Sequence, residues 1–227
     1  MFRKLFLISL TLLLLSLGAG VARADTVVFS NFGPGMTFNT NIAWNIGSSS
    51  PPFVRANRFT ATSNLNFSSA QLPLEVFRGS SPSILQVILE TDAGGVPGSV
   101  MEILNVSLDP LLPASVVTAT SVLNPLLTSG VNYWLVVFAP GTNTLGGWFF
   151  SFSDFPTGNN FAFNSIPSPT GPWTLLGTSS NPRGAFQING NAPVPEPATI
   201  LLLGTGLVGL ASRVCKRKST FKPEPPE

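Results

Sequence analysis

The chain has 227 residues, of which 44% are hydrophobic and only 10% are charged. Twelve Lys and Arg residues against ten Asp and Glu residues give a formal net charge of +2, and there is no histidine. The lack of histidine excludes Ser-His-Asp triads, Cys-His dyads and the usual histidine-containing zinc sites.

The first 24 residues have the pattern of a secretory signal peptide. Arg3-Lys4 forms a positive n-region, and an apolar run extends from Leu5 to Leu17. Small residues at Ala22 and Ala24 complete the signal, so we predict cleavage before Asp25 by signal peptidase after export through the Sec translocon. The alternative is an uncleaved anchor, but the run is shorter than the ~20 residues that a membrane span prefers.

Residues 25–193 form the predicted ectodomain, which is large enough for one domain with a real core. It contains four arginines, seven carboxylates and no lysine, a net charge of −3. The basic residues of the chain are concentrated in its terminal segments, so we expect no nucleic-acid partner. The single cysteine, Cys215, lies outside this domain, so stability must come from packing.

The ectodomain is rich in Phe, Val, Thr, Ser, Asn, Gly and Pro, which favours short strands between turns. No window shows a convincing amphipathic helix. The resulting prediction is an all-β fold, a β-sandwich of the jelly-roll-like kind. The predicted strands cover residues 26–32, 53–60, 65–77 (broken near Pro73), 84–91, 99–108, 115–123, 133–139, 147–152, 161–164, 173–176 and 185–189.

Two of these segments alternate in the manner of half-buried strands. Leu72, Leu74 and Val76 share one face with Glu75 opposite, and Leu85, Val87 and Leu89 share a face with Gln86 and Glu90 opposite. The apolar faces are expected to pack between the two sheets. The run from Asp92 to Gly98 (DAGGVPG) predicts a hairpin turn. Tyr133 and Trp134 are neighbours on one strand, so their side chains should point to opposite faces, one in the core and the other toward the surface.

Carboxylates are the remaining candidates for catalysis. A glycoside hydrolase needs two facing carboxylates, and Glu90 and Glu102 lie around the predicted hairpin. Asp92 is a weak candidate calcium ligand, together with turn carbonyls of Gly94 or Gly95. The competing interpretation makes all three acids solvated strand or turn residues. We favour that interpretation, and we predict no catalytic residue, no cofactor and no enzymatic activity.

Aromatic side chains are the candidates for carbohydrate binding. Trp148 and Trp173 flank turns rich in Gly and Pro, where an exposed ring could stack on a sugar. The alternative is core packing, because aromatic residues supply most of the buried area of a β-sandwich.

The C-terminal segment contains three features in a fixed order. The short motif Val194, Pro195, Glu196 and Pro197 comes first, and the apolar segment Ala198–Ala211 follows. The segment is short for a membrane span, because 14 helical residues cover ~21 Å of a core ~30 Å thick. The positive-inside rule then places the motif outside the cell. The basic stop consists of Arg213, Lys216, Arg217 and Lys218, and residues 219–227 form a cytoplasmic tail.

These three features resemble the PEP-CTERM sorting signal of exported proteins in Gram-negative bacteria. The resemblance covers residues 194–218 and implies recognition at Pro195, Glu196 and Pro197, retention by a short transmembrane helix, and processing by an exosortase, a membrane-embedded protease. It also implies an association with exopolysaccharide. The tail departs from the pattern, because Pro223-Glu224-Pro225 repeats the motif beyond the basic stop. The alternative is a plain C-terminal anchor, which predicts that the tail persists.

The ectodomain has a weaker resemblance. Segments 87–103 (VILETDAGGVPGSVMEI), 127–140 (LTSGVNYWLVVFAP) and 146–151 (GGWFFS) are similar to the choice-of-anchor β-sandwich domains that often precede PEP-CTERM tails. The sequence therefore predicts a non-enzymatic protein of the cell surface or extracellular matrix, associated with exopolysaccharide or biofilm. The alternatives are a carbohydrate-binding module of that matrix and a glycoside hydrolase with a carboxylate pair.

Overall fold

The computed structural model describes residues 25–47, 52–141, 143–152, 154–155, 158–166, 168–177 and 182–192. The predicted signal peptide, sorting signal and cytoplasmic tail (residues 1–24, 194–218 and 219–227) lie outside these residues. Within the described ranges, no helix is long and apolar enough to cross a membrane. The chain divides into compact units between Ala192 and Pro193.

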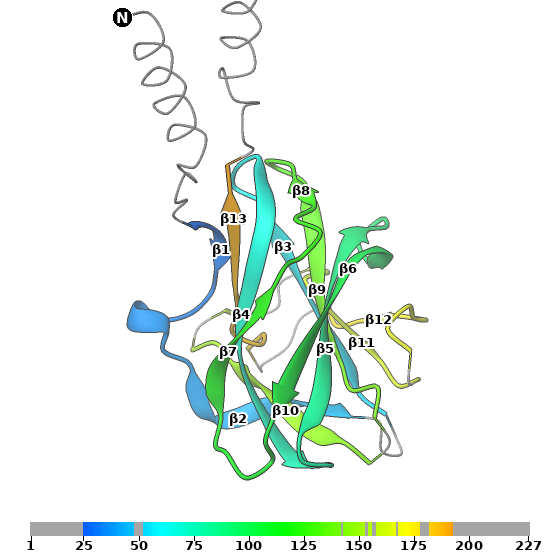
Figure 1. The fold of residues 1–227 in the computed structure, drawn as a ribbon. Helices are drawn as coiled ribbons and strands as arrows, with labels where there is room; N and C mark the ends of the chain where they lie inside the picture. Colours follow the sequence, from blue (N-terminus) through cyan, green and yellow to red (C-terminus); the bar gives the residue numbers. More distant parts are fainter. Residues whose placement is uncertain are drawn as a thin grey trace, which may run out of the picture. The chain divides into compact units, whose positions relative to one another are not determined.

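The described residues form thirteen strands and one 3₁₀ turn at Pro34–Met36 (Figure 1). The strands are β1 (Thr26–Ser30), β2 (Asn39–Gly47), β3 (Val54–Thr60), β4 (Leu65–Arg78), β5 (Ser83–Asp92), β6 (Pro97–Leu108), β7 (Ser115–Thr120), β8 (Leu126–Leu127), β9 (Asn132–Phe138), β10 (Leu145–Phe150), β11 (Phe161–Asn164), β12 (Thr174–Leu175) and β13 (Gln187–Asn191).

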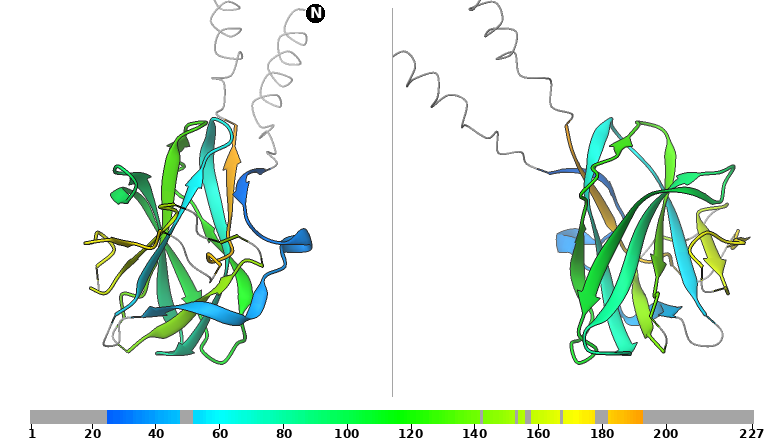
Figure 2. Two further views of the ribbon diagram at one scale, coloured as in Figure 1. Left: turned by 180° about the vertical axis from the view of Figure 1, so that it is seen from behind. Right: turned by 45° about the vertical axis from the view of Figure 1, so that its right-hand side comes forward.

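These strands form two antiparallel sheets that face each other, as the two views of Figure 2 show. One sheet has the order β1-β13-β4-β10-β2, with β7 and β8 also paired to β4. The other has the order β12-β11-β3-β9-β5-β6. The predicted all-β sandwich is therefore confirmed.

The space between the sheets holds the main core, and the predicted alternation is confirmed there. Leu72, Leu74 and Val76 of β4 are at most 1% exposed, as are the three apolar residues of β5 on the same face, Leu85, Val87 and Leu89. Burying each such side chain stabilises the fold by about 1.5–3 kcal/mol. The predicted hairpin is also confirmed, because β5 pairs with β6 across the turn at residues 92–97.

A second apolar cluster covers the outer face of the six-stranded sheet. It contains Ile88, Trp134 and Val136, and Trp173 and Leu175 pack against it. Tyr133 points into the main core, whereas Trp134 belongs to this second cluster. The two side chains therefore lie on opposite faces as predicted. The expectation that one of them lies near the surface was wrong, because the second cluster buries Trp134 as well.

Three details of the strand prediction were wrong. Strand β2 was missed because its sequence, NTNIAWNIG, is mostly polar and only Ile46 and Gly47 are buried. Strand β8 was missed because it has only two residues. Strand β4 continues through Pro73, where β7 pairs with it on one side. On the other side the partner changes at Pro73: β13 pairs as far as Gln71 and β10 begins at Leu74. The missing N–H of a proline is tolerated where a ladder is interrupted.

The two ends of the described unit meet on one sheet. Strand β1 pairs with β13, and Thr26 lies opposite Gly190. The chain therefore enters and leaves the sandwich at the same end of the seven-stranded sheet.

Candidate functional site

The turn between β5 and β6 is built around Asp92. Gly95 N donates a 3.0 Å hydrogen bond to Asp92 Oδ2, and Gly94 and Gly95 take positive φ angles of 71° and 95°. Asp92 Oδ1 accepts a 2.7 Å hydrogen bond from Trp134 Nε1 and lies 3.2 Å from Arg58 Nε in an ion pair. Both carboxylate oxygens thus already have N–H partners. This geometry favours the turn-residue interpretation and counts against Asp92 as a calcium ligand.

Metal-binding clusters are also missing from the part of the chain that the structure describes. No group of three or more His, Cys, Asp or Glu side chains there lies close enough together to hold an ion. A shallow depression lies beside Asp92, between Met101 and residues 130–133. Among the residues that line this depression, only Asp92 carries a carboxylate. That carboxylate is already bonded to Gly95, Trp134 and Arg58.

Glu102 is a buried residue whose hydrogen bonds link the two sheets. It lies on β6 opposite Leu89 and is only 4% exposed. Ser121 Oγ donates a 2.5 Å hydrogen bond to Oε2, and the amides of Val122 and Leu123 donate to Oε1 at 2.6 and 2.9 Å. One carboxylate therefore fixes the turn that follows β7, a strand of the other sheet. The expectation of a solvated side chain was wrong for Glu102.

Glu90 is buried in a different way. It is 0% exposed on β5 opposite Trp134 of β9, and neither of its carboxylate oxygens has a hydrogen-bond partner among the described residues. Burial raises the pKa of Glu90 to about 8. The group is therefore held mainly in its neutral form at pH 7, and the expectation of a solvated side chain was wrong here too.

Glu90 and Glu102 do not form a catalytic pair. Glu102 is the cross-strand partner of Leu89, whose side chain lies in the core between the sheets. Glu90 follows Leu89 on β5 and shares the outer face with Ile88 and Trp134. Side chains on opposite faces of one sheet cannot flank a glycosidic bond, so this pair is excluded by the geometry.

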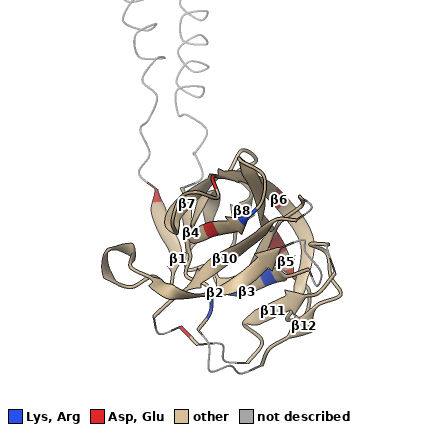
Figure 3. Cartoon of the chain, turned by 90° about the horizontal axis from the view of Figure 1, so that it is seen from below, with Lys and Arg blue, Asp and Glu red and all other residues tan. Residues whose placement is uncertain are grey.

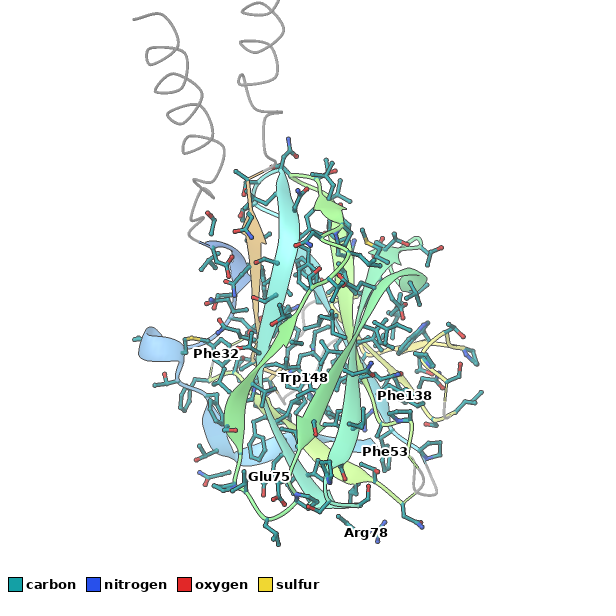
Figure 4. All side chains as sticks on the ribbon, viewed as in Figure 1. Phe32, Phe53, Glu75, Arg78, Phe138 and Trp148 are labelled. Atoms are coloured by element: carbon teal, nitrogen blue, oxygen red, sulfur yellow. The ribbon has the colours of Figure 1, made fainter. Side chains whose placement is uncertain are left out.

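Trp148 is a core residue, which contradicts its candidate role as a sugar platform. It is 0% exposed, and its Nε1 donates a 2.8 Å hydrogen bond to the carbonyl of Ala185 (Figure 4). A Cβ atom added to Gly184 would lie 2.5 Å from the indole, so the ring fills its space. Trp173 is half-buried against the second apolar cluster, and its Nε1 is buried without a partner.

Charged side chains are few and scattered over the sandwich (Figure 3). Two ion pairs are formed within the described ranges, Arg58 with Asp92 and Arg183 with Asp154. The sequence did not single out Arg55 as a candidate site residue. In the structure Arg55 is buried, and its guanidinium packs against aromatic rings. The available signal was its position in the otherwise apolar start of a strand, FVRA at residues 53–56.

The comparison with known families concerns the segment that follows β13. A family model described as "PEP-CTERM protein-sorting motif" matches residues 193–218. Residues 193–218 carry a PEP-CTERM sorting motif. The predicted resemblance is thereby confirmed, and the motif supports exosortase-dependent sorting of an exported protein. No curated protein matches the chain.

The match includes every part of the predicted signal: Val194 to Pro197, the apolar segment and the basic stop from Arg213 to Lys218. These residues lie outside the described ones, so their individual roles stay predictions. The same holds for Ala22 and Ala24, whereas Asp25 is an exposed residue immediately before β1.

Proposed function

We propose that this protein is a non-enzymatic component of the bacterial surface or extracellular matrix, delivered by its PEP-CTERM tail. In this proposal the Sec translocon and signal peptidase act on the N-terminal segment. An exosortase-like protease then acts near Pro195-Glu196-Pro197 while the apolar segment is held in the inner membrane. The sandwich is finally retained at the cell surface or in exopolysaccharide.

The observation that carries the proposal is the sorting motif directly after the last strand. Strand β13 ends at Asn191, and the matched segment starts at residue 193. The exclusion of the Glu90–Glu102 pair supports the non-enzymatic part. So does the composition, since the chain has no histidine and its one cysteine, Cys215, lies in the sorting signal.

The test is the C-terminal sequence of the mature protein from its native host, measured by mass spectrometry. We expect a chain that ends near Pro195-Glu196-Pro197 and lacks the apolar segment. A mature protein that still ends at Glu227 would overturn the processing step and favour a plain anchor.

The repeated tripeptide supplies a matched control. Glu196→Ala should block processing, whereas Glu224→Ala alters the same Pro-Glu-Pro sequence beyond the basic stop and should leave processing intact. Equal effects of the two substitutions would contradict recognition of the first motif.

A further inference from the structure

Arg55 on β3 is a buried cation surrounded by three aromatic rings. Its side chain keeps only 8% of its surface exposed. The guanidinium carbon lies 5.3 Å from the ring centre of Trp44, 5.1 Å from that of Phe53 and 5.6 Å from that of Phe163. Contacts of this kind stabilise a cation through the ring quadrupole. We call these four residues the Arg55 cluster.

No carboxylate among the described residues neutralises this charge. Arg58 and Arg183 each have an acidic partner, whereas Arg55 forms no ion pair there. Arg55 Nε donates a 3.0 Å hydrogen bond to the carbonyl of Asn45. Burial lowers the pKa of Arg55 to about 10, so it stays protonated at neutral pH. A buried charge without a counterion is costly unless something pairs with it.

A second unpaired polar group lies beside Arg55. Asn57 is two residues further along β3 and therefore on the same face. It is 0% exposed, and in the part of the chain that the structure describes neither its amide nitrogen nor its amide oxygen has a hydrogen-bond partner. Its cross-strand partner on β11 is Phe161, on which Trp44 stacks at 4.6 Å. Within the described residues, strands β2, β3 and β11 thus combine a cation without an ion pair and an amide without a hydrogen bond with aromatic side chains.

Part of this cluster reaches the surface. Trp44, Phe53 and Phe163 are each half-buried, and Phe53 lies toward the end of the sandwich at which β2 crosses (Figure 4). In Figure 1 that end is opposite to the one at which β13 ends. The cluster therefore borders the surface at these three rings.

We propose that the Arg55 cluster binds the carboxylate of an acidic sugar, a uronic acid unit of a polysaccharide. The planar guanidinium can donate two parallel hydrogen bonds to one carboxylate. The half-buried rings of Phe53 and Phe163 supply the apolar contact for the C–H face of a pyranose. A nucleic acid fits worse, because its affinity comes from contacts to many successive phosphates and the cluster supplies a single cation. This inference is independent of the sorting proposal.

The experiment is isothermal titration calorimetry of the purified full-length chain in detergent with tetragalacturonic acid. The fully methyl-esterified tetramer is the matched ligand, since it keeps the sugar rings and removes the charge. We expect saturable binding of the acid, with an affinity at least about tenfold lower for the ester. Arg55→Gln should weaken binding of the acid by at least about tenfold, whereas Arg78→Gln removes an exposed charge and should leave it within about twofold.

Several results would overturn the proposal: no binding of the acid, equal binding of the ester, or an equal loss with Arg78→Gln. Inorganic sulfate bound as tightly as the tetramer would show an adventitious anion only. Thermal melting checks that Arg55→Gln is folded. If it is not, Phe53→Leu keeps the cation and removes one ring, and unchanged affinity in that variant would reject the site. Binding can fail while the tail is still processed, so the two proposals fail separately.

Discussion

Glu102 and Glu90 lie on one hairpin and are both buried, but their surroundings differ. Glu102 faces the space between the sheets and receives hydrogen bonds from Ser121, Val122 and Leu123. Glu90 faces the second apolar cluster and receives none from its surroundings. Burial alone therefore does not decide what a carboxylate contributes; the supply of donors does. Glu102 should therefore stabilise the fold through its hydrogen bonds, whereas Glu90 should make the stability of the fold depend on pH.

The largest expected effect is on Glu102. Glu102→Ala leaves the Ser121 hydroxyl and two backbone amides without their acceptor, which should lower the free energy of unfolding by about 4 kcal/mol. Urea denaturation followed by circular dichroism measures this change. Glu75→Ala on β4 is the control, because the Glu75 side chain makes no hydrogen bond within the described residues, and its effect should be below about 1 kcal/mol. Similar losses in both variants would remove the contrast between bonded and unbonded carboxylates.

Glu90 should produce a pH dependence instead. The folded chain holds the Glu90 proton up to a pKa of about 8, against an ordinary value of 4.5. Stability from this group is therefore fully present below pH 4.5 and is lost as pH rises to about 8, with a slope of up to about 1.4 kcal/mol per pH unit. Glu90→Gln should flatten that slope. Denaturation midpoints between pH 5 and 9 measure it, and parallel curves for wild type and variant would contradict the assignment.

Two tryptophans extend the same contrast to neutral donors. Trp148 Nε1 is bonded to Ala185, whereas Trp173 Nε1 is buried without a partner. Trp148→Phe should cost about 2–3 kcal/mol, because it leaves a carbonyl unpaired and a gap in the core. Trp173→Phe deletes the same atoms and should change stability by less than about 1 kcal/mol. Thermal melts of both variants provide the comparison, and the reverse order would refute the role given to the hydrogen bond.

The smallest expected effect concerns Asp92, the third carboxylate of the hairpin. Its oxygens are occupied by Gly95, Trp134 and Arg58, so we expect no binding of calcium. The melting temperature should therefore be the same with millimolar calcium and with a chelator. A rise in the presence of calcium that disappears in Asp92→Asn would restore the calcium hypothesis.

The local pattern predicted the parts of the fold that depend on neighbours in sequence. The alternation at Leu72, Leu74 and Val76 was enough to predict which face of β4 is buried. The glycines between β5 and β6 were enough to predict a turn, because they adopt positive φ angles there. The surroundings of Glu90 and Glu102 depend on distant segments, because Glu102 is bonded 19 to 21 residues away and the outer face is covered by residues near Trp173. No periodicity within β5 or β6 encodes these contacts.

The candidate sites show the same division. The sorting signal is a continuous stretch of sequence, so it was found without a structure. The Arg55 cluster joins residues from β2, β3 and β11, which are up to 119 positions apart, so only the fold assembles it. The burial of Trp148 follows from Ala185 and Phe186, which come just before the last strand.

Strand β13 is hydrogen-bonded on both sides, to β1 and to β4. A tether attached after Ala192 would therefore transmit mechanical load into an interior strand. Pulling β13 out along its axis requires the ladders on both sides to shear together, whereas an edge strand could be peeled away one bond at a time. A domain that hangs from this strand should resist drag from flowing liquid without needing a disulfide.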